Sequence, residues 1–154
     1  MAKIATIVLA FGLAFTFVFG VIRYQEPGMA PAVKDGDLVL FFRFASSSLR
    51  AQDAVLITYQ GQWQVRRVIA VAGDVVDITD AGLMINGSVQ QEPEIYQATD
   101  RFADGVTLPL TVPPGEVFLL GDARNKATDS RIYGCVRTED IRGKVMMVIR
   151  HRSI

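Results

Sequence analysis

The sequence is short of the residues on which many catalytic and metal sites depend. Its 154 residues include one histidine, His151, and one cysteine, Cys135. A single cysteine cannot form an internal disulfide, so the cysteine count does not indicate in which redox compartment the protein is located. A single histidine nearly excludes histidine-based metal sites, and a Ser-His-Asp triad would have to rest on a residue beside the chain end. We therefore expect no metal and no cofactor.

Net charge is also lacking. Sixteen lysines and arginines stand against sixteen aspartates and glutamates, which gives a formal net charge of zero. Domains that bind nucleic acid gather an excess of basic residues on one face. The balanced charge therefore argues against a nucleic-acid partner.

One long stretch lacks charge altogether. Residues 4–22 read IATIVLAFGLAFTFVFGVI, which as a helix is about long enough to span a bilayer core of about 30 Å. The alternative is a cleaved secretory signal, because Ala30-Pro31-Ala32 is a formal small-x-small cleavage site. The length of the apolar run and its distance from that site favour an anchor over residues 1–23. Lys3 and Arg23 flank the run, so the positive-inside rule does not fix its orientation.

The remaining residues, 24–154, are predicted to form one β domain. Runs rich in β-branched and aromatic residues predict strands, and they cover 37–44, 54–59, 62–72, 75–79, 83–85, 117–120 and 144–150. Turn formers separate these runs, and Asn86-Gly87 predicts a tight hairpin. No segment after residue 23 has a long helical stripe. The predicted fold is all-β, with one N-terminal transmembrane helix followed by an antiparallel, barrel-like domain.

Two segments of this domain carry weaker expectations. Residues 46–53 read SSSLRAQD and are the best candidate for a short helical turn, because serine can cap a helix. The stretch from about Gln91 to Pro109 is the longest without strand character, and we expect it to be a mobile loop.

Three polar motifs follow the apolar run in a fixed order. They read GMAP at 28–31, VRRVIAVAGD at 65–74 and GDARNKATDSRIYG at 121–134. Each alone is compatible with a linker, a strand ending in a turn, or a charged loop. Together the chain resembles the type I signal peptidases, membrane-tethered serine proteases with a Ser-Lys dyad, whose motifs run S-M-x-P, V-K-R-V-x-G-x-P-G-D and G-D-N-R-x-x-S-x-D-S-R-x-x-G. The resemblance extends from the anchor to about Met147, and includes the segment DGDLVL at 35–40.

The resemblance also implies that the catalytic dyad is degenerate. Gly28 stands at the nucleophile position and has no side chain, and Arg66 stands at the lysine position. A guanidinium stays protonated and cannot act as a general base. Ala127 stands where the family has a serine that orients the lysine, and Glu26 stands where some members have an oxyanion-binding hydroxyl. A carboxylate there would repel a developing oxyanion.

These replacements suggest two further expectations. Glu26 and Arg66 are expected to form an ion pair that fills the dyad site. Ser46, Ser47 and Ser48 are poor substitutes for the missing nucleophile, because no lysine lies at a spacing that would recruit them.

The scaffold residues of the third motif are retained. By resemblance they form a structural clamp, with Asp129–Arg131 as one expected ion pair and Asp122–Arg124 as a second. The clamp residues are Asp122, Arg124, Asp129, Ser130 and Arg131.

The resemblance implies a binding role for exported proteins. Signal peptidases bind an extended peptide beside the motif strands, and the candidate contacts here are Met29, Pro31, Val65 and Arg67. We expect a single-pass protein of the cell membrane with its β domain on the extracytoplasmic face. It would hold a signal peptide or pilin segment without cutting it, as in catalytically deficient family members associated with sortases and pilus assembly. The alternatives are an active type I signal peptidase, or a membrane-tethered β domain without a peptide groove.

Overall fold

The N-terminal helix is shorter than the sequence predicts. In the computed structural model, which describes residues 2–44 and 49–150, helix α1 covers Ala2–Val18 and strand β1 covers Phe19–Arg23. The prediction of a helix through residue 22 is therefore wrong. Residues 19–23 instead pair with β2, Leu38–Phe42, because their β-branched and aromatic side chains suit a strand. In the described ranges, no helix combines the length and the apolar character that crossing a bilayer requires.

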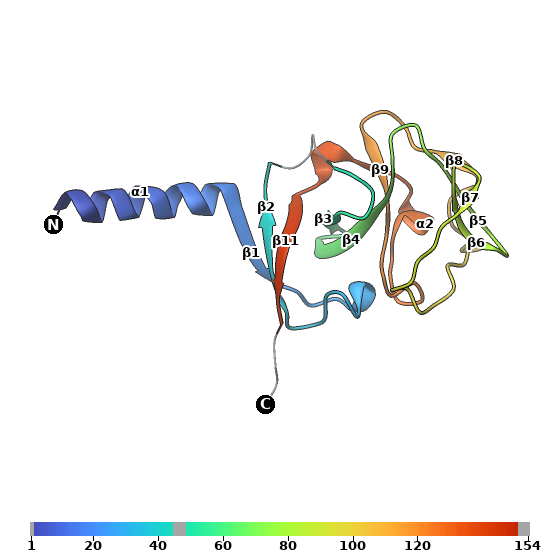
Figure 1. Ribbon diagram of the computed structural model, residues 1–154, viewed down its shortest axis with the longest axis horizontal. Helices are drawn as coiled ribbons and strands as arrows, with labels where there is room; N and C mark the ends of the chain where they lie inside the picture. The colour runs from blue at the N-terminus through green and yellow to red at the C-terminus, as the bar shows by residue number, and fades with distance from the viewer. Residues whose placement is uncertain (1, 45–48, 151–154) are drawn as a thin grey trace.

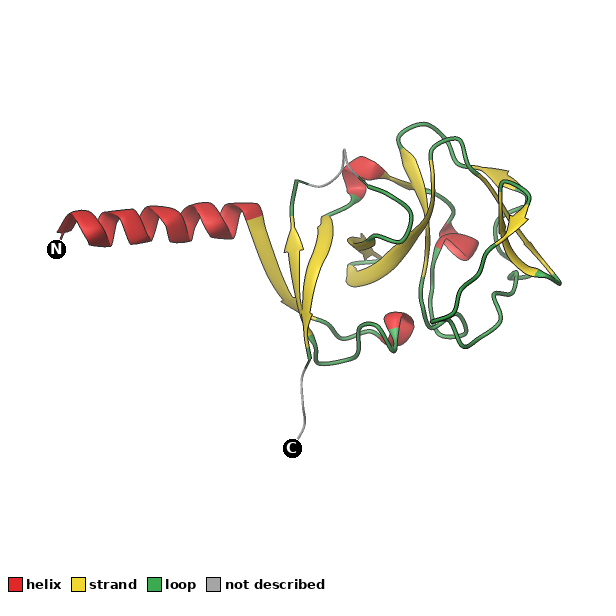
Figure 2. Cartoon of the chain, viewed as in Figure 1, coloured by secondary structure: helices red, strands yellow, loops and turns green. Residues whose placement is uncertain are grey.

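Most of the domain is one curled, antiparallel, seven-stranded sheet (Figures 1 and 2). Its strand order is β1-β2-β11-β3-β4-β9-β10. The remaining strands are β3 (Ala54–Tyr59), β4 (Gln62–Val71), β9 (Glu116–Leu120), β10 (Val136–Arg137) and β11 (Gly143–Ile149). The mostly-β, antiparallel prediction is confirmed.

A second, four-stranded sheet lies at the end of the domain farthest from α1 (Figure 1). Its order is β7-β6-β5-β8, from β5 (Val75–Thr79), β6 (Gly82–Ile85), β7 (Ser88–Val89) and β8 (Leu110–Thr111). The hairpin predicted at Asn86-Gly87 joins β6 to β7, and both residues have positive φ, 52° and 80°. Such φ values at both central residues are those of a type I′ turn.

Short helices occur where the chain leaves the sheets. They are the 3₁₀ turns η1 (Pro27–Met29) and η2 (Thr138–Asp140) and the single turn α2 (Ser130–Tyr133). Of the segment expected to form a helical turn, residues 46–48 lie outside the described residues, and 49–53 contain no helix. Residues 91–109 contain neither helix nor strand, and their mobility stays a prediction.

Two sheet edges border one another near η1. Among the strands of the described residues, β1 pairs with β2 alone. In the same part of the chain, β4 pairs with β9 only from Arg67 onward, so its residues 62–66 pair with β3 alone. A cavity of about 290 Å³ lies between these edges and is lined by residues 23–26 on one side and 61–63 on the other.

Candidate functional site

The ion pair expected between Glu26 and Arg66 is present. Arg66 projects from β4 and is fully buried, and Glu26 lies just before η1 with 16% of its side chain exposed. The guanidinium donates two hydrogen bonds to the carboxylate in a bidentate arrangement, with Nη1–Oε2 at 2.8 Å and Nη2–Oε1 at 3.0 Å. Two parallel charge-assisted bonds of this kind are among the strongest polar contacts in proteins.

The Arg66 side chain has no unused donor. Nε and Nη2 donate to the Thr128 carbonyl at 3.0 and 2.9 Å, and Nη1 donates to the Val65 carbonyl at 2.6 Å. Together with the two bonds to Glu26, these account for all five N–H groups of a guanidinium. The buried charge is therefore fully hydrogen-bonded, which is the condition under which such a charge is tolerated.

Tyr24 completes the coordination of the Glu26 carboxylate. The buried Tyr24 hydroxyl donates to Glu26 Oε2, and the nearby backbone of Gly28 also lowers the pKa of this carboxylate. Burial alone would raise the pKa of Glu26, but the hydrogen bonds from Arg66 and Tyr24 outweigh it and lower that pKa. Burial and the neighbouring Glu26 raise the pKa of Tyr24, so the tyrosine stays protonated and acts as a donor.

Arg66 is held in its charged form. Burial would lower the pKa of the guanidinium, but the hydrogen bonds and charge of Glu26 raise it. Tyr133 of α2 also lies near this charge, and burial raises the pKa of its phenol. None of these groups is arranged to accept a proton at neutral pH.

Gly28 lies directly beneath the carboxylate. A Cβ placed on Gly28 would stand 2.6 and 2.9 Å from the two carboxylate oxygens of Glu26, and 3.0 Å from Arg66 Nη1. Real Cβ atoms essentially never approach neighbours under 3.0 Å. The Glu26–Arg66 pair therefore occupies the space that a side chain at position 28 would need.

Ala127 belongs to the same neighbourhood. A Cβ on Gly121 would stand 2.2 Å from the Ala127 Cβ and 2.5 Å from the Gly28 carbonyl, and that carbonyl accepts from Ala123 N–H at 3.0 Å. The loop after β9 thus packs closely against η1. The structure brings together the four positions singled out by sequence, Glu26, Gly28, Arg66 and Ala127.

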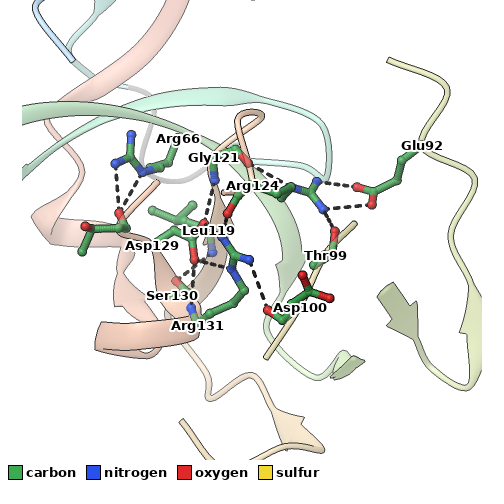
Figure 3. A network of polar contacts seen from close by, with 11 residues as sticks. Arg66, Glu92, Thr99, Asp100, Leu119, Gly121, Arg124, Asp129, Ser130 and Arg131 are labelled. Atoms are coloured by element: carbon green, nitrogen blue, oxygen red, sulfur yellow. Dashed lines mark hydrogen bonds and ion pairs between the residues drawn. The ribbon is translucent and has the colours of Figure 1, made fainter. Parts of the chain in front are cut away.

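The expected Asp129–Arg131 pair is the centre of a buried network (Figure 3). The Asp129 carboxylate accepts a hydrogen bond from Arg131 Nε at 2.9 Å. It also accepts from the backbone N–H groups of Gly121 and Arg131, both at 3.1 Å. Ser130 Oγ accepts from Leu119 N–H at 2.9 Å. These bonds join α2 to β9 and to the loop that packs on Gly28, so a structural role fits them.

The second expected pair, Asp122 with Arg124, is wrong. The Asp122 carboxylate instead accepts hydrogen bonds from Arg67 Nε at 2.8 Å and from Arg67 Nη2 at 2.5 Å. Hydrogen bonding to Asp122 raises the pKa of Arg67. Arg124 turns away to Glu92, with Nη1–Oε2 at 2.9 Å and Nη2–Oε1 at 2.5 Å, and also donates to the Thr99 hydroxyl (Figure 3). Asp122 and Arg124 thus each bond to a residue far away in the sequence.

The predicted peptide contacts lie in different environments. Met29 and Val65 are fully buried in a core cluster with Val39, Phe41 and Leu56. Pro31 is exposed and Arg67 is engaged with Asp122. Their role in peptide binding stays a prediction. The candidate nucleophiles 46–48 lie outside the described residues.

Sequence reasoning missed several contributors to the site. Tyr24 belongs to no motif, and Thr128 lies in the third motif at a position to which the resemblance gives no role; both contact Glu26 or Arg66. Glu92 and Thr99 likewise belong to no motif and bond to Arg124. Trp63, 46% exposed, lines the cavity between the two edges.

Comparisons with known proteins agree with these observations. Residues 1–150 match the protein family described as "Signal peptidase, peptidase S26". Signal peptidase I of Bacillus caldolyticus is 30% identical over 142 residues, covering 84% of this chain and 78% of that protein. Probable thylakoidal processing peptidase 2 of Arabidopsis thaliana is 36% identical over 100 residues, 58% of this chain, and the match spans only 26% of that longer protein.

A solved structure shares the fold. The crystal structure of a signal peptidase I from Enterococcus faecalis V583 is similar, with a TM-score of 0.54 and 27% sequence identity. The likeness covers 65% of this chain and 97% of the other. The chain therefore belongs to the signal peptidase family, peptidase S26.

Proposed function

We propose that this protein is a signal peptidase I-like factor without peptidase activity, which holds an extended segment of an exported protein and does not cut it. The observation that carries the proposal is the Glu26–Arg66 pair lying over Gly28, within 2.6 Å of a Cβ position. This pair fills the place in which a nucleophile and its base would have to meet.

Each group that a Ser-Lys peptidase requires has an unsuitable replacement here. Gly28 offers no hydroxyl, and Arg66 cannot accept a proton. The Glu26 carboxylate lies beside Gly28, with its oxygens 2.6 and 2.9 Å from a Cβ position on that glycine. That carboxylate places negative charge where a tetrahedral intermediate would develop its own.

Peptide binding can survive these losses, because it depends on backbone edges. An extended peptide adds to a free strand edge through main-chain hydrogen bonds. The free edges of β1 and of residues 62–66 of β4 border one cavity of about 290 Å³. A segment of signal peptide or pilin lying there would contact Trp63 and end beside Glu26.

The proposal includes a membrane location. Helix α1 is apolar and runs directly into β1 (Figure 1). Large apolar side chains stay exposed on β1, β2 and β11, namely Val21, Leu38, Met146, Met147 and Ile149. A continuous apolar surface of this kind marks a membrane or protein interaction site. We place the protein at the cell membrane with its β domain on the extracytoplasmic face, where sortases and pilins are the partners that the family resemblance suggests.

Active signal peptidase is the second candidate. It is favoured by the family membership and by relatives named as peptidases. A test is incubation of the purified full chain, in detergent, with a preprotein that carries a signal peptide. We expect the preprotein to stay intact over hours. Cleavage after a small-x-small site, lost when the protein is omitted, would overturn the proposal.

Binding needs its own test, since an inert domain would also leave the preprotein intact. A photo-crosslinking residue in place of Trp63 should capture a signal-bearing or pilin segment. The control places the same residue at Val75, an exposed site on the small sheet. Equal labelling at both positions would favour a structural domain without a groove.

A further inference from the structure

The Glu26 carboxylate is bound as though it were a ligand. Three donors converge on it: Nη1 and Nη2 of Arg66 and the Tyr24 hydroxyl. Arg66 and Tyr24 are both fully buried. The carboxylate itself belongs to the one member of the cluster that is partly exposed.

The donors are held in place independently of Glu26. Each of the three donor nitrogens of Arg66 also bonds to a backbone carbonyl, of Thr128 or of Val65. If the Glu26 side chain rotated out, the guanidinium would therefore stay where it is, with two N–H groups pointing into the vacated space. A planar guanidinium so presented matches the two oxygens of a carboxylate.

The position of this site relates it to the groove. Residues 23–26 form one wall of the cavity between the free edges, so Glu26 itself lines the cavity. The carboxylate lies over Gly28 Cα, at the close approach described above. A peptide running along the groove would bring its last residue to this point.

We infer that Arg66 and the Tyr24 hydroxyl form a carboxylate-binding site, which Glu26 occupies in the free protein and which takes the C-terminal carboxylate of a peptide lying in the groove. This inference rests on the proposed function, because it needs a groove that binds peptides. It names the class of ligand: an extended peptide with a free carboxyl end at this point. A continuous chain or a peptide amide cannot supply the second oxygen or the charge.

Tethering explains why only a peptide would displace Glu26. An internal group two residues from Tyr24 has a high effective concentration, and small free acids cannot match it at ordinary concentrations. A peptide gains additional main-chain bonds along the edges of β1 and β4. Those bonds offset the competition from Glu26.

The test compares a short alanine-rich peptide as its free acid with the same peptide as its C-terminal amide. The full chain in detergent is used, and binding is followed by fluorescence of Trp63, which is the sole tryptophan of the sequence and lines the groove. We expect the wild type to prefer the acid severalfold. In Glu26→Ala the preference for the acid should rise to about tenfold or more. The peptide carboxylate then forms its charged, hydrogen-bonded pair with Arg66 without competition from the Glu26 carboxylate.

Arg66→Met in the Glu26→Ala background is the matched control, and it should abolish the preference while amide binding persists. If Glu26→Ala does not fold, Glu26→Gln keeps the side-chain shape and should give a preference between those of wild type and Glu26→Ala. Equal binding of acid and amide by the wild type, or a preference that survives Arg66→Met, would overturn the carboxylate site and leave the peptide groove intact. Failure of both peptides to bind any variant would overturn the proposed function as well.

Discussion

The Glu26 carboxylate and Gly28 are mutually constrained. One carboxylate oxygen lies 2.6 Å from the point where a Cβ on Gly28 would stand, and that carboxylate is fixed by Arg66 at 2.8 and 3.0 Å. A side chain at position 28 and an intact ion pair therefore cannot coexist without movement. This relationship links positions 28 and 66, at which the proposed function places the lost nucleophile and the lost base.

Gly28→Ser should lower the free energy of unfolding by about 1–3 kcal/mol, the usual cost of forcing extra atoms into a packed site. The cost should be smaller in a Glu26→Ala background, because the obstructing carboxylate is gone. Urea denaturation of the wild type, the two single variants and the double variant measures the cost of Gly28→Ser in each background. Gly12→Ser is a control for adding a hydroxymethyl group, since no atom lies within 4 Å of a Cβ there. A Gly28→Ser variant as stable as wild type would contradict the constraint.

Restoring the dyad alone should restore little activity. In Gly28→Ser/Arg66→Lys, Glu26 would still place a carboxylate beside the new lysine, keeping the amine protonated and repelling an oxyanion. Adding Glu26→Ser and Ala127→Ser removes that charge and supplies the missing hydroxyls. Cleavage of a signal-bearing preprotein should be undetectable with the double variant and measurable with the fourfold variant. Efficient cleavage by the double variant would show that the supporting positions do not matter.

The Glu26–Arg66 pair should show strong coupling in stability. Removing one partner leaves a buried charge unpaired, at a cost of about 3–5 kcal/mol, whereas replacing both with apolar residues of similar size is often nearly neutral. Glu26→Leu and Arg66→Met should each destabilise the protein more than the double variant does. Thermal and urea unfolding of the four proteins give the coupling energy directly. Additive losses would mean that the pair contributes no mutual stabilisation.

Much of the β domain could be predicted from sequence because its strands alternate and its turns use characteristic residues. Residues 54–59 and 75–79 form strands with the predicted bounds, and the Asn86-Gly87 hairpin is present. These features are local, since residue pattern and turn chemistry decide them. The apolar run gave a wrong prediction of helix at residues 19–22. Its pattern is equally compatible with helix or strand, and pairing with β2 makes these residues a strand.

The partners of a side chain could be predicted from sequence only where local backbone structure, such as one helical turn, brings the two residues together. Asp129 and Arg131 meet within one helical turn, and Asp129 caps that helix by accepting from the Arg131 N–H. Asp122 and Arg124 are equally close in sequence, yet each bonds to a residue brought from elsewhere by the fold. The Glu26–Arg66 pair was reachable because the family resemblance places both positions in one cleft.

The two pairs that replaced the expected one give a test of their own. Arg124→Met should be coupled to Glu92→Gln and not to Asp122→Asn, because Arg124 forms its ion pair with Glu92 whereas Asp122 forms its ion pair with Arg67. Conversely, Asp122→Asn should be coupled to Arg67→Met. Double-mutant cycles in urea measure both. Coupling between Arg124 and Asp122 above about 0.5 kcal/mol would contradict this arrangement.

The lowered pKa of Glu26 predicts a specific dependence of stability on acid. A carboxyl whose pKa is lower in the folded than in the unfolded protein stabilises the fold fully above its unfolded value, 4.5, and this contribution is lost as the pH falls through the folded value. Although burial opposes it, the hydrogen bonds from Arg66 and Tyr24 set the direction of the shift. The difference in unfolding free energy between wild type and Glu26→Gln should therefore be constant near neutral pH and shrink on acidification below about 4.5. Comparing the two proteins cancels the titration of other carboxyls, so a difference that stays constant into strong acid would show that Glu26 does not carry the charge of this pair.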